Sequence, residues 1–193
     1  MKLKIKDIAD IRIGYQFRKK IKTEPDGSHA VIQMRDFDDY NNLNYRELMR
    51  VRLAELSDKY LVNKNDVLFL SRGHSNFAFT ITNSLENTIA ASYFFILKVN
   101  SDKVLPEYLA WGINQTPAQK LLHNIARQGT HMPLVPMSAF EYLEVHVPDI
   151  KTQKSIVELN RLLNRENELL RKLQEKRSLL IGSLSIKAAK ASD

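Results

Sequence analysis

The most regular pattern of hydrophobic positions lies near the C-terminal end of the chain, where apolar residues recur at alternating spacings of three and four. The residues between them are mostly Glu, Asn, Arg, Lys and Gln, which is the a/d pattern of a coiled-coil helix. The seam positions are Ile156, Leu159, Leu163, Glu166, Leu170, Leu173, Arg177, Leu180 and Leu184. We predict a dimerisation and spacer helix over residues 151–185, roughly 50 Å long at 1.5 Å per residue, and a frayed tail over 186–193. Its seven apolar seam residues are expected to bury against a partner helix.

Shorter apolar runs fill residues 1–150. Runs rich in β-branched and aromatic residues predict strands at 29–34, 66–70, 77–81, 92–99 and 143–147. A short helix around 6–9 should lead into a strand that ends at Gly14, and further helices are predicted from Pro106, from Pro117 and over 137–140. The prediction is an α+β domain with a mixed sheet or barrel-like core and short helices, followed by the long helix.

The composition of the chain favours some classes of partner and excludes some kinds of site. The 193 residues include 29 Lys and Arg against 22 Asp and Glu, a net charge of +7, which favours an anionic partner such as nucleic acid. The absence of Cys excludes a disulfide scaffold, Cys-ligated zinc and thiol catalysis, and fits a reducing cytoplasm. The chain has neither a signal-like apolar run at its start nor a long uncharged apolar window, so we expect a soluble, cytoplasmic protein without a membrane segment.

Motifs for chemistry are lacking. The six glycines are spread along the chain, so neither a dinucleotide-binding fingerprint nor a P-loop can be written. The histidines lack metal-ligand spacing, and the serines near Arg72 lack a nucleophile elbow. The motifs of adenine methyltransferases and metal-dependent nucleases are also missing. We expect a protein that is not an enzyme and holds no cofactor or metal.

Four polar loops remain, at 14–22, 33–42, 71–77 and 126–131, each rich in side chains that contact phosphates or base edges. The candidate DNA-binding residues are Arg18, Lys19, Lys20, Gln33, Arg35, Arg72, His74, Asn76, Arg127, Gln128 and His131. Each loop also has a plainer interpretation. The first could be a solvated basic turn, and Arg35 could form a structural ion pair with Asp36 or Asp38.

The order of these segments carries a family resemblance. The segments that carry the resemblance are KLKIKDIADIRIGYQFR, VIQMRD, NDVLFLSRGHSNFAF, SYFFILK, LPEYLAWGIN, ARQGT and LEVHVPDIKTQKSIVELNRLLNRENELLRKL. Together they resemble one half of the specificity (S) subunit of type I restriction-modification systems. The passage PDIKTQKSIV is similar to the Pro-x-x-x-x-Gln-x-x-Ile junction between recognition domain and conserved helix, although 151–154 is more basic here than in the usual version.

The resemblance implies a non-catalytic DNA-recognition component. Members of the family carry two recognition domains and two helices that pack as an antiparallel coiled coil, whereas this chain has one of each. It therefore implies a half-subunit that pairs with itself and reads a bipartite, palindromic target in double-stranded DNA. Methyltransferase (M) and restriction (R) subunits would supply adenine methylation, cleavage and their cofactors. Two alternatives stay open: a stand-alone coiled-coil dimeric DNA-binding regulator or adaptor, and a remnant or exchangeable half of a longer subunit.

Overall fold

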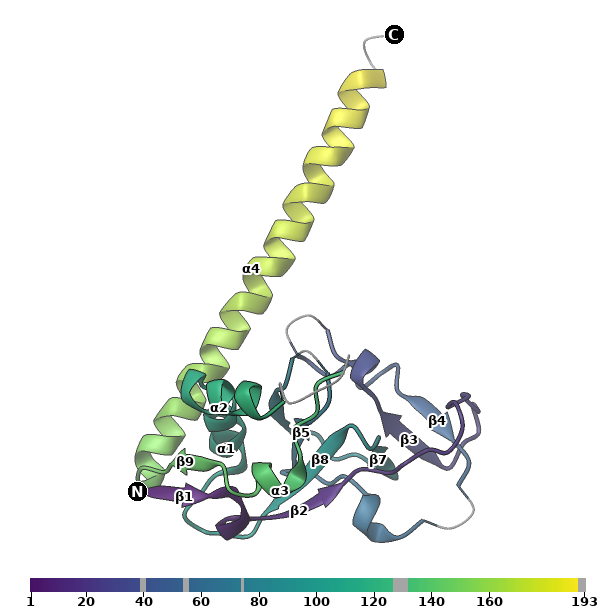
Figure 1. The fold of residues 1–193 in the computed structure, drawn as a ribbon. Helices are drawn as coiled ribbons and strands as arrows, with labels where there is room; N and C mark the ends of the chain where they lie inside the picture. The colour runs from purple at the N-terminus through teal and green to yellow at the C-terminus, as the bar shows by residue number, and fades with distance from the viewer. Residues whose placement is uncertain (39–40, 54–55, 74, 127–131, 191–193) are drawn as a thin grey trace. The chain divides into compact units, whose positions relative to one another are not determined.

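The computed structural model describes residues 1–38, 41–53, 56–73, 75–126 and 132–190. The chain forms two compact units, Met1–Lys154 and Ser155–Asp193, and the long helix α4 (Ile150–Lys190) contributes its first residues to the first unit (Figure 1). The sequence pattern predicts the division at residue 150.

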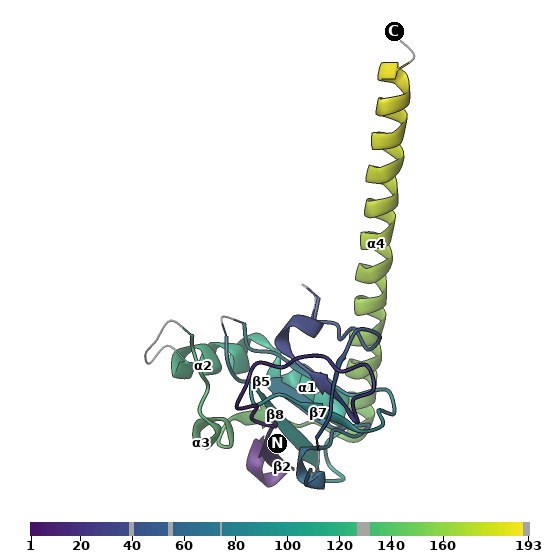
Figure 2. The ribbon, with the colours of Figure 1, turned by 90° about the vertical axis from the view of Figure 1, so that its right-hand side faces the viewer.

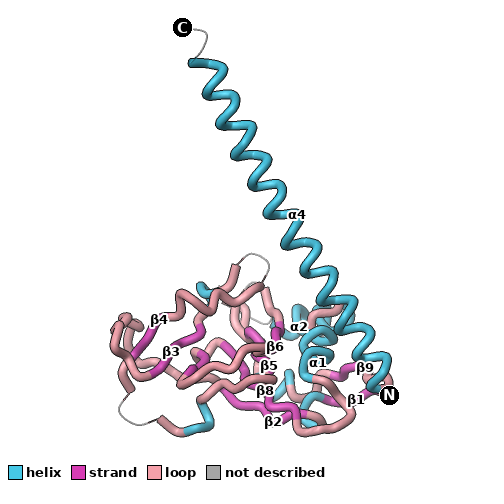
Figure 3. Tube along the Cα trace, turned by 180° about the vertical axis from the view of Figure 1, so that it is seen from behind, coloured by secondary structure: helices cyan, strands magenta, loops and turns pink. Residues whose placement is uncertain are grey.

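The first unit contains three small sheets, and its α+β class agrees with the prediction. The antiparallel pair β1–β9 joins the two ends of the unit's chain. A four-stranded antiparallel sheet has the order β2-β8-β5-β6, and a three-stranded sheet has the order β4-β3-β7, in which β3 and β7 are parallel. The strands are β1 (Lys2–Lys4), β2 (Ala9–Ile13), β3 (His29–Ile32), β4 (Met49–Val51), β5 (Val67–Leu70), β6 (Ala78–Thr80), β7 (Thr88–Ala90), β8 (Phe94–Val99) and β9 (Glu144–His146). Figure 3 shows β1 and β9 at one end of this unit and β3 and β4 at the other.

The core follows from the continuous apolar runs that predicted buried strands. All four residues of β5 are buried, as are the first four of β8. Successive side chains of a strand point to opposite faces of the sheet, so both faces are covered at these strands. Phe69 of β5 stacks on Phe140 with ring centroids 4.3 Å apart. Phe140 belongs to the short helix α3 (Met137–Phe140), so this stacking packs α3 onto the sheet.

Two further helices belong to the first unit. Pro106 is the first residue of α1 (Pro106–Ile113), as expected for a residue without a backbone N–H donor, and α2 (Thr116–Ala126) follows after a short turn. Figure 2 shows α1 lying against the strands, in agreement with its contacts to β5, β6 and β9. Tyr108 of α1 donates a hydrogen bond from its hydroxyl to the carbonyl oxygen of His146 at 2.6 Å, and burial raises the pKa of this tyrosine.

The start of α4 is held by side chains of the first unit. Asp149 caps the helix: its carboxylate accepts hydrogen bonds from the backbone N–H of Thr152 at 3.0 Å and from the Thr152 hydroxyl at 2.8 Å. These bonds hold the pKa of Asp149 below its usual value. The cap explains why the helix begins at Ile150, directly after Asp149.

Gln153, one turn into α4, is completely buried within the first unit. Its Oε1 accepts a hydrogen bond from the backbone N–H of Leu105 at 2.9 Å, and its Nε2 donates to the carbonyl oxygens of Lys103 at 2.7 Å and Pro148 at 2.9 Å. One buried amide therefore satisfies three backbone groups of the part-buried junction. This Gln is the polar residue of the junction that the sequence analysis singled out.

The second unit consists of the remainder of α4. Its apolar side chains are exposed in the single chain: Leu159, Leu163, Leu170, Leu173, Leu180 and Leu184 each expose more than half of their surface. A helix end was predicted near residue 185, with a frayed tail over 186–193; this was wrong for 186–190, which are helical. The small and basic residues there favour helix, and two lysines in the last turn oppose the negative end of the helix dipole. Residues 191–193 lie outside the described part of the chain.

Candidate DNA interface

The loop that follows β2 is attached firmly to the three-stranded sheet by its aromatic residues. The backbone N–H of Tyr15 donates to the carbonyl oxygen of Ala90 at 2.7 Å. The Tyr15 ring meets Phe17 and Tyr60 edge to face, with centroids 4.8 and 5.2 Å away. Gly14 is required at the turn, since a Cβ there would collide with the backbone of residues 90 and 91. The aromatic side chains are thus anchored to the sheet. Arg18, Lys19 and Lys20, which follow Phe17, remain exposed.

These exposed basic residues line a groove of about 950 Å³, which we call the basic groove. Its charged and aromatic lining residues are Tyr15, Phe17, Arg18, Lys19, Lys20, Lys22, Glu24, Arg52 and Tyr60. Five of these are basic and one is acidic. Such a surface can neutralise phosphates while aromatic rings pack on sugar or base.

Arg18, Lys19 and Lys20 were predicted from the sequence, and the structure brings them together with Arg52, which was not. Arg52 follows β4, and its guanidinium lies 3.8 Å from the Glu24 carboxylate. The apolar pattern of residues 49–51 is too short to identify a strand, so the sequence offered no means of placing Arg52 beside residues 18–22.

The loop after β3 is built mainly for structure. Gln33 and Asp36 form a capping box around the short 3-10 helix Met34–Asp36, in which the Gln33 N–H donates to the Asp36 carboxylate at 2.7 Å. Burial raises the pKa of Asp36, opposed by this hydrogen bond and by Arg35. The Arg35 guanidinium lies 3.7 Å from the Asp36 carboxylate, so the ion-pair alternative for Arg35 is the observed one.

The surface beside this loop is predominantly acidic. A hollow of about 470 Å³ is lined by Arg35, Asp36, Phe37, Asp38, Asn44 and Glu47. Three carboxylates against one guanidinium disfavour phosphate contact. Gln33 and Arg35 are therefore weaker candidates than the basic groove, although the Gln33 Nε2 atom is buried without a hydrogen-bond partner among the described residues.

Arg72 occupies a different setting in the loop after β5. Its guanidinium lies 5.7 Å from the centre of the Tyr93 ring, and no ion pair engages it within the described part of the chain. The backbone around it is fixed, because Gly73 donates to the carbonyl oxygen of Pro133 at 2.9 Å and Val135 donates to that of Ser71 at 2.8 Å. Gly73 has a φ of +120°, which favours glycine at this turn. A half-buried arginine on a fixed loop is well suited to contact a base edge.

Of the remaining candidate DNA-binding residues, only Asn76 lies in the described part of the chain. Asn76 donates from Nδ2 to the carbonyl oxygen of Leu70 at 2.9 Å, so its amide helps to close the loop. His74, Arg127, Gln128 and His131 lie outside the described residues.

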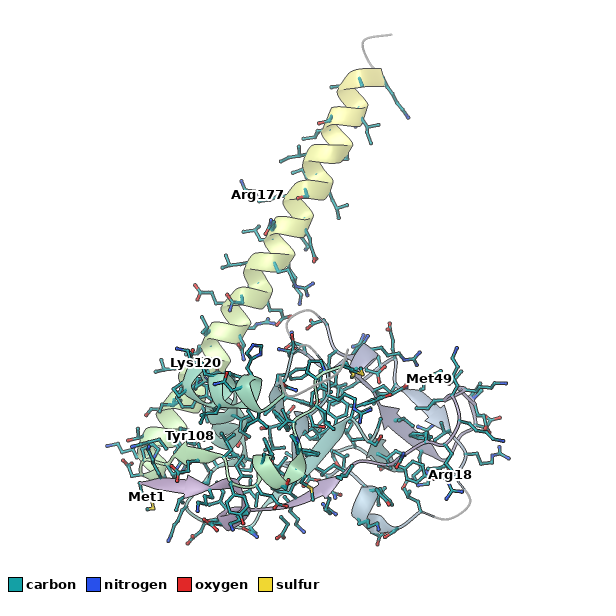
Figure 4. All side chains as sticks on the ribbon, in the orientation of Figure 1. Met1, Arg18, Met49, Tyr108, Lys120 and Arg177 are labelled. Carbon is teal, nitrogen blue, oxygen red and sulfur yellow. The ribbon has the colours of Figure 1, made fainter. Side chains whose placement is uncertain are left out.

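The loops fall into two groups. The Phe37 and Phe77 rings pack edge to face at 5.1 Å, which joins the second loop to the third. Residues 133–135 pair with 71–73, so the segment that follows the fourth loop lies beside the third. The basic groove packs on a different apolar cluster, since Tyr15 and Phe17 lie against Val31, Val51 and Ile89, whereas Phe37 and Phe77 belong to the cluster around Ile32 and Phe94. Figure 4 shows Arg18 at the β3–β4 end of the unit, away from Lys120 on α2.

The described part of the chain contains neither a metal-ligand cluster nor a membrane-spanning helix. No group of three or more His, Asp or Glu side chains could hold a metal ion there. No described helix is long and apolar enough to cross a membrane.

Comparison with known proteins identifies the family. The model of the type I restriction modification DNA specificity domain matches residues 1–176. The chain belongs to this family. This is the family that the sequence resemblance named.

Relatives of the specificity-domain family support this assignment. The type I restriction enzyme HindI specificity subunit of Haemophilus influenzae is 26% identical over 133 residues, which cover 67% of this chain and 28% of that protein. The fold is similar to the S subunit from M. genitalium (TM-score 0.60, 15% identity, 90% of this chain and 41% of that one) and to the HsdS subunit from Thermoanaerobacter tengcongensis (TM-score 0.61, 14% identity, 90% and 39%). The chain thus spans well under half the length of these relatives.

Proposed function

We propose that this protein is the DNA-recognition subunit of a type I restriction-modification complex, acting in the cytoplasm as a homodimer of half-subunits. The observation that carries the proposal is the basic groove, a cluster of five cationic and three aromatic side chains on a domain of the specificity family. Phosphate contacts from this groove would position the domain on the duplex, and base contacts from polar loops would select the sequence.

The dimer follows from the second unit. A helix that exposes a row of leucines in the single chain needs a partner, and isologous two-fold pairing is the commonest closed assembly. Two recognition domains related by a two-fold axis would read two half-sites, so the target is a palindromic sequence interrupted by unread base pairs. Separate M and R subunits would methylate adenine in that target and cleave unmodified DNA.

The basic groove makes a prediction about salt dependence. Replacing Lys19 by Ala should weaken binding to all DNA sequences to a similar degree and should lower the slope of log K against log salt by about 1 per recognition domain. Titration of labelled duplexes at several salt concentrations measures both quantities. Lys120→Ala removes the same charge from α2, away from the groove, and serves as the control. An unchanged slope in the Lys19 variant would remove the groove from the interface.

Arg72 makes a prediction about sequence preference. Replacing it by Ala should relax discrimination at one base pair in each half-site, by about 1 to 3 kcal/mol if the contact is a bidentate one to guanine. Selection of bound sequences from a randomised duplex pool reports the preference position by position. Arg72→Lys keeps the charge but loses the planar fork, so it should also relax that position. A preference identical to that of the original protein would exclude Arg72 as a base-reading residue.

A further inference from the structure

Two charged residues interrupt the apolar seam of α4. Glu166 and Arg177 occupy a/d positions, with Leu170 and Leu173 between them. Glu166 lines a groove of about 670 Å³ on the helix surface together with leucines, and Arg177 lines a second groove of about 420 Å³. Both grooves include Leu170 and Leu173. A partner helix that covers these leucines would therefore also cover Glu166 and Arg177.

These two charges lack a partner among the described residues of the single chain. The other described acidic residues of the second unit pair with basic side chains along the helix: Glu158 with Arg161 at 2.9 Å, Glu175 with Arg171 at 3.0 Å, and Glu168 with both Arg165 and Lys172. Neither Glu166 nor Arg177 forms an ion pair or a side-chain hydrogen bond among the described residues. Figure 4 shows Arg177 projecting from the side of the helix. Charges covered by an interface without a counter-charge would be strongly unfavourable.

We propose that α4 pairs with α4 of a second copy of this chain in an antiparallel register in which Glu166 of each copy forms an ion pair with Arg177 of the partner subunit. This inference rests on the proposed homodimer, takes the antiparallel sense that the family resemblance implies, and adds the register and the two ion pairs that fix it. The two-fold axis would cross the helices between Arg171 and Lys172. In antiparallel coiled coils each a residue faces a d residue of the other helix, and this register satisfies that rule along the seam.

The same register matches the seam from Leu159 to Leu184, while Ile156 at its end would face the partner's Lys187. With Glu166 opposite the partner's Arg177, all the remaining layers between residues 159 and 184 contain leucine from both chains. These layers are Leu159 with the partner's Leu184, Leu163 with the partner's Leu180, and Leu170 with the partner's Leu173. Each layer occurs twice by symmetry, so the seam is self-complementary in both hydrophobicity and charge.

A parallel dimer lacks this match. It would place Glu166 against Glu166 of the partner subunit and Arg177 against Arg177 of the partner subunit, giving two layers of like charge inside the seam. Like charges at an interface suppress a pairing, whereas opposite charges at the same positions select it. The flanking positions place no like charges opposite one another in the antiparallel register. Leu169 faces the partner's Lys176, and Asn167 faces the partner's Gln174. The two charged residues thus specify both the sense of the dimer and the choice of an identical partner.

Charge reversal in the full-length chain tests the ion pairs. Glu166→Arg alone and Arg177→Glu alone should each raise the dimer dissociation constant by roughly 10- to 100-fold, because each creates two like-charge layers. The double variant Glu166→Arg/Arg177→Glu restores opposite charges and should return to within about threefold of the original value. Sedimentation equilibrium measures these constants. Single variants as tight as the original protein, or a double variant as weak as the singles, would overturn the proposed ion pairs.

Cysteine cross-linking tests the sense directly, since the chain contains no Cys of its own. The variant Leu163→Cys/Leu180→Cys should form a covalent dimer on oxidation, because these positions face one another across the antiparallel seam. Leu163→Cys alone should not cross-link, because its two copies would lie roughly 25 Å apart along the helix. Efficient cross-linking of the single variant would show a parallel pair and overturn the register. A chain that remains monomeric would instead overturn the homodimer itself, so the two failures are distinguishable.

Discussion

Replacing Leu170 by Glu is expected to abolish dimerisation and to weaken binding to a bipartite DNA target by roughly 100- to 10,000-fold. Leu170 lies at the middle of the seam and exposes 55% of its surface in the single chain. In the dimer it would be covered by Leu173 of the partner subunit, so a carboxylate there would be buried twice without a counter-charge. The loss of affinity follows because two linked domains bind with an avidity that one domain lacks.

A matched control separates this effect from a general loss of helix. Leu179 belongs to the same helix but not to the seam, and it exposes 74% of its surface. Leu179→Glu should leave both the dimer and DNA binding unchanged. Sedimentation analysis gives the oligomeric state, and titrations with the full target and with a single half-site give the affinities. The Leu170 variant should bind the half-site as tightly as the original protein does. A Leu170→Glu variant that remains a dimer would refute the assignment of the seam.

Replacing Gln153 by Ala is expected to destabilise the first unit by about 3 kcal/mol or more. The side chain is fully buried and satisfies the N–H of Leu105 and the carbonyl oxygens of Lys103 and Pro148. Its removal breaks three hydrogen bonds, each of which contributes about 1 kcal/mol, and leaves a cavity where the buried amide was. Urea denaturation followed by tryptophan fluorescence can measure the change, because the single Trp111 lies in α1 of this unit.

Two further variants define the role of Gln153. Glu has a similar shape but cannot donate to the two carbonyl oxygens when ionised, so Gln153→Glu should also be strongly destabilising. Lys154→Ala, at the exposed neighbouring position, should change the free energy of unfolding by less than about 0.5 kcal/mol. A Gln153→Ala variant as stable as the Lys154 control would show that the hydrogen bonds of this amide contribute nothing to stability.

The parts of the fold that the sequence predicted were those with a long or strongly apolar pattern. The strands β5 and β8 and the helix α4 extend over runs whose burial or periodicity is plain in the residues themselves. The strands β1, β4 and β7 were not predicted, because each has three residues and depends on pairing with a distant segment. Their existence is a consequence of tertiary structure, which a local pattern does not contain.

The candidate interface shows the same division. The basic residues 18–20 are consecutive, so their clustering was visible in the sequence, whereas Arg52 joins them only through the pairing of β3 with β4. Gln33 and Arg35 have the right chemistry for base contacts, but the fold uses them around the buried Asp36. Side-chain type identifies candidates, and the hydrogen bonds of the folded chain decide which of them remain available.

The central claim is that this chain selects the DNA target of a type I methyltransferase as a symmetric dimer. The most direct test is to co-express it with its M subunit in a host that lacks adenine methylation and then to map modified adenines across the host genome. The account predicts methylation confined to one palindromic motif with two half-sites and a fixed spacer. Methylation at an asymmetric motif would contradict the homodimer. No methylation, together with specific DNA binding by the isolated chain, would contradict the role in modification and indicate a stand-alone regulator.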